Sequence, residues 1–116
     1  MILEDIKQKL EEIDANVYYG LCDDDNPVWN YIVFNRVKPS YSENNTSHSD
    51  YFDVHIVREN FIPEDLDVAV VAKLRELHGV RLSKEDGRYD YTIKPNTNTV
   101  VEALTLHFVR ARKCSR

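Results

Sequence analysis

The stretch Trp29-Asn-Tyr-Ile-Val-Phe-Asn-Arg-Val37 decides the fold, because its aromatic and β-branched residues are strongly strand-forming. Tyr31 and Val33 fall on one face of such a strand. Ile32 and Phe34 fall on the other. We therefore predict a strand that is covered on both faces, by the protein's own core on one side and by a further layer on the other.

A second strand follows downstream, in the segment Asp50-Tyr-Phe-Asp-Val-His-Ile-Val-Arg58. Apolar and polar residues alternate there, with Phe52, Val54 and Ile56 facing inward, as is typical of a half-buried antiparallel strand. Residues 38–49, between the two strands, have almost nothing apolar to bury. The composition predicts a long, mobile loop over those residues.

Two amphipathic helices flank these strands. The first is predicted from the helical spacing of five apolar residues near the start of the chain: Ile2, Leu3, Ile6, Leu10 and Ile13. The second is predicted from Glu64 to Leu77, after Pro63, because four residues recur at spacings of four, four and three: Leu66, Val70, Leu74 and Leu77. Gly79 is placed to end it just after His78.

The remaining segments complete an α+β domain. We predict a strand over Val17–Cys22, followed by an acidic loop, and a short strand over Val80–Leu82. Two further strands, Tyr89–Ile93 and Val100–Val109, are predicted to form a closing hairpin. We expect the order α-β-β-β-α-β-β, in a four- to five-stranded antiparallel or mixed sheet with both helices on one face. Residues 1–116 form one domain in this interpretation, with a C-terminal tail from about residue 111.

Composition limits the classes of function. The 116 residues are 42% apolar and suffice for one core, and no apolar run approaches the roughly 20 residues that cross a bilayer. The charged start of the chain argues against a secretory signal. The formal net charge of -5 argues against a dedicated nucleic-acid binder. Cys22 and Cys114 lie in different contexts, which excludes a disulfide framework and fits a reducing cytosol.

The second face of the predicted sheet carries more apolar side chains than a small monomer leaves exposed to solvent. Six residues are expected to point toward it: Tyr31, Val33, Tyr51, Val57, Val101 and Val109. A subunit interface is the simplest explanation.

No residue pattern predicts catalysis, a cofactor or a metal. Asp53 and His55 share a strand face, and with His48 and Asp50 they suggest a metal site, but no third ligand has a fixed spacing, so solvated polar residues are the preferred interpretation. Neither cysteine lies in a recognisable nucleophile motif. The three glycines are isolated from one another, which excludes a glycine-rich phosphate loop.

The C-terminal segment is basic. Arg110, Arg112 and Lys113 stand there without a neighbouring acid, so they are solvated or touch another molecule. For a chain of net negative charge, the acidic residues 23–25 of an adjacent copy are a more natural partner than DNA.

The order of segments resembles the small tail proteins of long-tailed bacteriophages, in particular the tail terminator or tail-to-head joining family. An amphipathic helix runs into Val17-Tyr-Tyr-Gly, and Trp29-Asn-Tyr-Ile-Val-Phe and Tyr51-Phe-Asp-Val-His-Ile-Val follow. A helix from Glu64 to Leu77 and a closing hairpin complete the pattern. The resemblance covers nearly the whole chain and rests on pattern, because the family has no invariant catalytic motif.

The resemblance implies an α+β subunit of a hexameric ring that ends polymerisation of the tail tube and joins the tail to the head connector. Its partners would be further copies, the tail tube protein and a neck protein, with DNA passing nearby unbound, in a virion assembled in the bacterial cytoplasm. It would use no cofactor or membrane.

Several residues are expected to contact partners in such a ring, from the acidic loop, the polar loop, the second sheet face and the basic end of the chain: Asp23, Asp24, Asp25, Tyr31, Val33, Tyr41, Glu43, Asn44, Asn45, Tyr51, Arg110, Arg112 and Lys113. Two alternatives remain open. One is another phage neck or head-closure component. The other is a small cytosolic ligand-binding or enzymatic dimer that uses Asp53 and His55.

Overall fold

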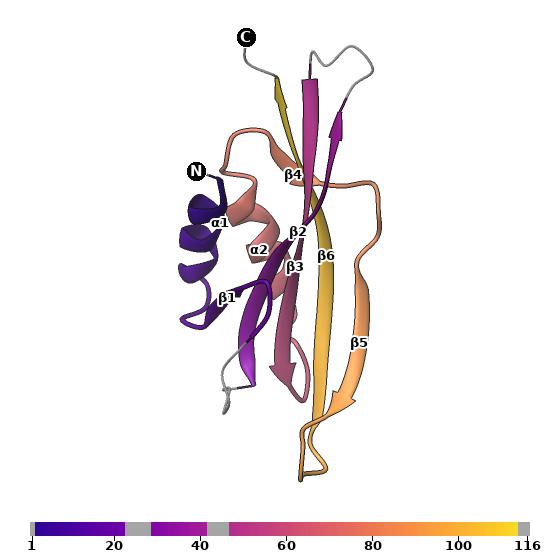
Figure 1. Cartoon of the computed structure of the whole chain (residues 1–116). Coiled ribbons are helices and arrows are strands. Elements are labelled where there is room, and N and C mark those ends of the chain that lie inside the picture. Colours follow the sequence, from indigo (N-terminus) through magenta and orange to yellow (C-terminus); the bar gives the residue numbers. More distant parts are fainter. Residues whose placement is uncertain (1, 23–28, 42–46, 114–116) are drawn as a thin grey trace.

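The computed structural model describes residues 2–22, 29–41 and 47–113. These described residues form two helices and six strands (Figure 1), which in chain order are α1 (Ile2–Glu11), β1 (Val17–Tyr19), β2 (Asn30–Tyr41), β3 (Ser47–Glu59), α2 (Leu66–Leu74), β4 (Val80–Leu82), β5 (Arg88–Ile93) and β6 (Val100–Lys113). None of these helices is long and apolar enough to cross a membrane.

The strands form one mixed sheet in the order β1-β2-β3-β6-β4, and β5 pairs with β6 as well. The β1–β2 pair is parallel and all other pairs are antiparallel. The predicted α+β class is confirmed, but the sheet has six strands where four or five were expected. The difference arises because β4 and β5 share one edge of the long β6: β4 pairs with residues 108–110 and β5 with residues 100–105.

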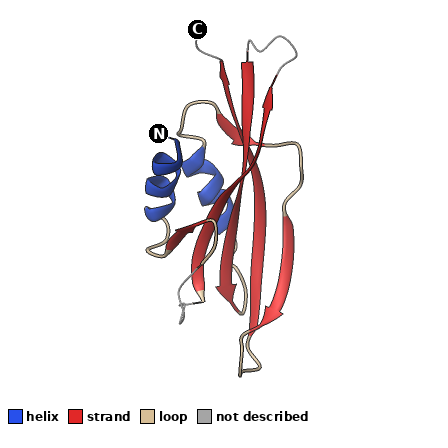
Figure 2. Cartoon of the chain, viewed as in Figure 1, coloured by secondary structure: helices blue, strands red, loops and turns tan. Residues whose placement is uncertain are grey.

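Both helices lie on one face of the sheet, as predicted (Figure 2). The predicted inward residues of β3 pack there with apolar residues of β2, β6 and both helices, in a single buried cluster that includes Ile6, Leu10, Ile32, Phe34, Val54, Ile56, Val70, Leu74, Leu104 and Phe108. Phe52 and Phe108 stack within it, with ring centroids 5.3 Å apart. Full burial of one such side chain contributes about 1.5–3 kcal/mol, so this cluster stabilises the fold.

The second helix is shorter than predicted and ends at Leu74, although Leu77 still packs against the core. Gly79 does not cap it directly. With φ of +80° it turns the chain into β4, and a Cβ at that position would lie 2.6 Å from the carbonyl oxygen of Ala111. The glycine is therefore required by a positive φ and by the close approach of β6.

The prediction of a mobile loop over residues 38–49 was wrong at both ends. β2 continues to Tyr41 and β3 begins at Ser47, and their register pairs Lys38 with Tyr51 and Tyr41 with His48. The rest of the predicted loop, residues 42–46, lies outside the described residues. Side-chain composition misled here because the ladder is made by backbone N–H and C=O groups, which polar residues supply equally well.

The C-terminal tail was also predicted to begin too early. β6 runs to Lys113 and pairs with β3 as far as Ser47, so residues 111–113 are strand. The ends of β2, β3 and β6 together form a three-stranded extension, which we call the arm: residues 38–41, 47–51 and 109–113. In Figure 1 the arm projects beyond both helices, and the molecule measures 54 × 26 × 24 Å.

Candidate assembly surface

The second face of the sheet is less open to partners than the sequence predicted. Val33 and Val57 are each only 8% exposed, and Val101 and Val109 are more deeply buried still. Val33 lies in register between Tyr18 of β1 and His55 of β3, so larger neighbours surround it. The valines of this face are therefore covered largely within the subunit.

A cluster of three aromatic side chains lies at one end of the second face. Tyr31 is half-buried, and its ring lies 5.8 Å from that of Tyr18 in an edge-to-face arrangement and 6.3 Å from that of Trp29. Burial raises the pKa of the Tyr31 phenol, and the nearby Cys22 adds to the effect. Tyr31 is thus held by its own subunit and offers a partner only part of its ring.

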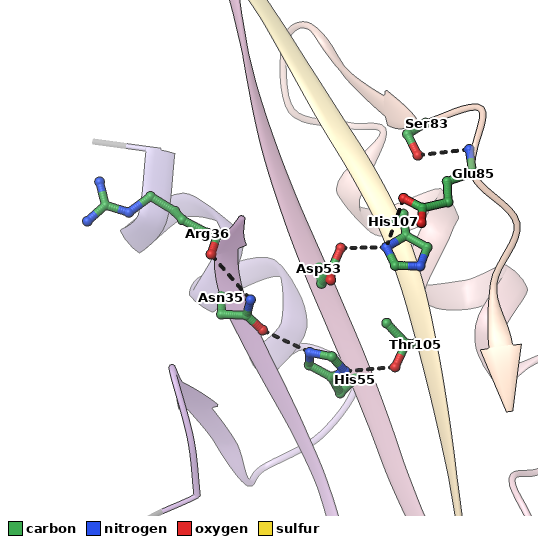
Figure 3. Close-up of polar contacts among 8 residues, drawn as sticks. All are labelled: Asn35, Arg36, Asp53, His55, Ser83, Glu85, Thr105 and His107. Carbon is green, nitrogen blue, oxygen red and sulfur yellow. Dashed lines mark hydrogen bonds and ion pairs between the residues drawn. The ribbon is translucent and has the colours of Figure 1, made fainter. Parts of the chain in front are cut away.

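The middle of the second face is polar and centres on His55 (Figure 3). Its Nε2 lies 2.8 Å from Asn35 Oδ1. That amide oxygen can only accept a hydrogen bond, so His55 Nε2 is the donor, while Asn35 Nδ2 donates to the Arg36 carbonyl. Its Nδ1 lies 2.8 Å from the Thr105 hydroxyl, which donates to it. Both ring nitrogens are thus bonded in the neutral form, and burial lowers the pKa of His55, with the nearby His107 adding to the lowering and Asp53 opposing it.

A second polar group lies beside it, where β6 passes the segment after β4. His107 Nδ1 donates to Asp53 Oδ1 over 2.7 Å, and Glu85 Oε2 lies 3.7 Å from the same nitrogen (Figure 3). The backbone N–H of Ser83 donates to the His107 carbonyl, and the Ser83 hydroxyl accepts from the N–H of Glu85. These bonds fix the segment after β4 against the sheet.

An open hollow of about 690 Å³ lies over this polar group, at the base of the arm, lined by Val37, Lys38, Tyr51, Asp53, Arg81, Ser83, Lys84, Glu85, His107, Phe108 and Val109. Its charged side chains are of both signs. Across the described ranges, no group of three or more His, Cys, Asp and Glu residues is placed to hold a metal ion. Asp53 and His55, which the sequence favoured as solvated polar residues over metal ligands, are part-buried, and each side chain bonds to a different neighbour within the sheet.

Among the predicted partner residues that the structure describes, the most accessible lies on the arm. Tyr41 is 61% exposed, and its ring centroid lies 4.9 Å from that of His48 on the neighbouring strand. The Lys38 ammonium lies 5.4 Å from the centre of the Tyr51 ring, a cation–π contact. Arg110 is half-buried, in register with Asp50. The structure therefore brings Tyr41, Tyr51 and Arg110 together on one projection.

Other predicted partner residues cannot be placed in the same way. Arg112 and Lys113 belong to β6, but their side chains lie outside the description, as do the acidic residues 23–25 and the loop residues Glu43, Asn44 and Asn45. Their expected contacts remain predictions.

Sequence reasoning predicted the strand β5 but missed that its apolar residues are exposed. Tyr89, Tyr91 and Ile93 are between 51% and 64% exposed, although they are in register with β6 on the face that the helices cover elsewhere. Figure 1 shows β5 at the edge of the sheet that lies away from both helices. The alternation predicted the strand but not that its apolar side lies beyond the reach of the helices.

Comparisons with known proteins do not identify a family. No family model matches the sequence, and no curated protein matches it. A solved structure of 13% sequence identity is similar over 99% of this chain and 96% of its own, with a TM-score of 0.49. A likeness at this level says nothing about function.

Proposed function

We propose that this protein is a structural subunit of a bacteriophage virion, a tail terminator that forms a ring, ends the polymerisation of the tail tube and joins the tail to the head connector. The observation that carries the proposal is the arm. Three paired strands extend beyond the helices with exposed aromatic and cationic side chains.

The arm is poorly explained as a stabilising element of the subunit. Ordering a residue costs about 1–2 kcal/mol of backbone entropy, while a hydrogen bond returns a net 0.5–1.5 kcal/mol. The arm lacks a helix layer, and Lys38, Pro39, Ser40 and Tyr41 are all exposed. Apart from Val109, which is 2% exposed at the base of the arm, the described side chains of the extension are exposed or half-buried. Such an extension is suited to contacts with another molecule, where further surface is buried.

Assembly through the arm gives a simple mechanism. A ring closes when each subunit presents one surface to the next and a different surface to the previous one, that is, through heterologous contacts. A ring seated on the tube end then occupies the contacts that the next tube ring would use. Its net negative charge suits a conduit whose wall does not hold DNA phosphates tightly.

A neck or head-closure component is the alternative that the same arm supports. The two differ in partner: a terminator binds the open end of the tail tube, whereas a head-closure protein binds the connector. The enzymatic alternative is weaker, because both ring nitrogens of His55 bond within the fold.

A binding experiment separates these functions. The full chain is incubated with purified tail tubes and, separately, with connector rings from the same phage genome, and co-sedimentation is measured. A terminator sediments with the tubes. A shortened-arm variant, with residues 39–50 replaced by Asn-Gly to make a two-residue hairpin between the paired Lys38 and Tyr51, is expected to fold and to lose that binding.

Lys7→Ala, on the exposed side of α1, is the matched control and should sediment as the full chain does. Binding to connectors and not to tubes would favour the head-closure role. Binding to neither, or equal tube binding by the shortened-arm variant, would contradict the proposal.

A further inference from the structure

The two long edges of the sheet differ in how they are protected against pairing with another strand. The outer edge of β2 is paired with β1 at residues 32–34. Beyond that pair, the β2–β3 register shifts at a bulge between Arg36 and Lys38, and Pro39 follows without an N–H to donate. Bulges and prolines are devices that keep an edge strand from pairing with another chain. The β2 edge is therefore protected against pairing with a strand of another chain.

The edge formed by β5 has no such device. Its register with β6 is unbroken from Arg88 to Ile93, and the segment contains no proline and no lysine. Every residue of the strand is exposed. An unprotected edge of this length is a template for a further strand.

The direction of the free backbone groups in β5 follows from neighbouring hydrogen bonds. The Val100 carbonyl accepts from Asn60, on the β3 side of β6, so the backbone groups of Val101 turn toward β5. Val101 is paired with Thr92, and alternate β5 residues thus bond to β6. The N–H and C=O groups of the other three therefore point away from the sheet, at Tyr89, Tyr91 and Ile93.

The same three residues carry the exposed apolar side chains of β5. On the opposite face of the strand, Arg88 and Asp90 form an ion pair of 3.3 Å. The edge thus combines free hydrogen-bonding groups with an apolar stripe on one face and charges on the other, which restricts the registers that a partner strand can adopt.

We propose that β5 pairs antiparallel with β5 of a second copy, about a twofold axis that passes at Tyr91. In this register Tyr91 faces Tyr91 of the partner subunit, Tyr89 faces Ile93 of the partner subunit, and six backbone hydrogen bonds form between outward groups, two for each of the three facing pairs. Aromatic and β-branched side chains then pair on one face.

Charge disfavours one of the two neighbouring registers. Moving the twofold axis to Asp90 would place that carboxylate directly opposite Asp90 of the partner subunit, which is unfavourable. In the proposed register Asp90 faces Thr92 of the partner subunit instead. Arg88 faces Lys94 of the partner subunit, but each cation already has an acidic partner within its own chain, Asp90 and Glu59 respectively.

The inference goes beyond the proposed function and uses a different surface. A twofold contact joins the same patch on two copies, so it cannot by itself close a ring, and it leaves the arm free. The shortened-arm variant should therefore still dimerise through β5.

Two lysine variants test the contact by sedimentation velocity of the full chain. Tyr91→Lys places two like charges opposite each other at the axis and should raise the dimer dissociation constant about tenfold or more. Thr92→Lys adds the same charge one residue away, but opposite Asp90 of the partner subunit, and should leave the dimer intact. A monomeric full chain at millimolar concentration, or equal effects of the two lysines, would overturn the proposal.

Cysteine cross-linking tests the register itself, in a background with Cys22→Ser and Cys114→Ser. A hydrogen-bonded antiparallel pair has Cα atoms about 5.5 Å apart, which suits a disulfide. Under mild oxidation Tyr91→Cys should cross-link rapidly to a covalent dimer and Thr92→Cys should not. If Tyr91→Lys lowers the mass of assemblies while Tyr91→Cys does not cross-link, the edge pairs with a different strand and the twofold contact is wrong.

Discussion

The body and the arm of this protein are built from the same three strands, β2, β3 and β6, but they are stabilised in different ways. In the body, one sheet face packs under two helices, and side chains such as Phe34 and Phe108 are almost completely buried. In the arm, the strands continue with polar and charged residues and with exposed Tyr41. We infer that the body supplies the free energy of folding and that the arm supplies binding surface.

The largest expected effect is in the body. Phe34→Ala removes a ring that is 1% exposed at the centre of the core and should lower the free energy of unfolding by about 3–5 kcal/mol. Urea denaturation followed by circular dichroism measures it. Tyr41→Ala, in the arm, is the control and should change the value by no more than about 0.5 kcal/mol. Similar losses in both variants would erase the distinction between body and arm.

The junction of the two regions should show an intermediate effect. Gly79→Ala adds a Cβ 2.6 Å from the Ala111 carbonyl oxygen at a φ of +80°, and we expect a loss of about 1–3 kcal/mol. Gly20→Ala is a matched control, because Gly20 also has a positive φ of +85° but nothing within 4 Å of the added Cβ. Thermal unfolding of both variants should rank Gly79→Ala as the less stable; the reverse order would show that no close approach exists at Gly79.

A smaller effect should depend on pH. Burial lowers the pKa of His55, so the unfolded chain binds a proton at this site more readily than the folded one, and stability should fall as the pH drops below about 6.5. The contribution of one such group is at most about 1.4 kcal/mol per pH unit. His55→Gln should reduce this slope between pH 6.5 and 5.5, as measured by urea denaturation. An unchanged slope would mean that His55 takes up a proton equally in both states.

The smallest effect on folding is expected in the arm. Lys38→Met removes the ammonium group above Tyr51 while keeping most of the apolar stem, and should cost about 0.5 kcal/mol. Lys84→Met, an exposed lysine in the segment after β4, is the control. A loss above about 2 kcal/mol for Lys38→Met, from the same urea titrations, would mean that the arm contributes to stability as the body does.

The same contrast explains what the sequence could predict. The body was predicted well, because Phe52, Val54 and Ile56 alternate toward the helices and the helix stripes recur at helical spacing. In the arm, residues 38–41 and 47–49 were predicted as a loop and residues 111–113 as a tail, because these segments bury little and their backbone ladder leaves no trace in the pattern of side chains.

The candidate surface was predictable only in part. Tyr41 and Arg110 were expected to meet partners, and the structure places both on the arm, but Val33 proved to be covered within the subunit. The exposed stripe of β5 escaped prediction, because alternation shows that Tyr89 and Tyr91 share a face and does not show how far the helices extend over it.

The central claim, that the arm allows this protein to end tail tubes, is tested most directly by the length of tubes assembled in vitro. Tail tube protein is polymerised with the full chain or with the shortened-arm variant, and lengths are measured by negative-stain electron microscopy. We predict short tubes with a ring at one end for the full chain, and long tubes without rings for the variant. Tubes of equal length in both mixtures would contradict the account.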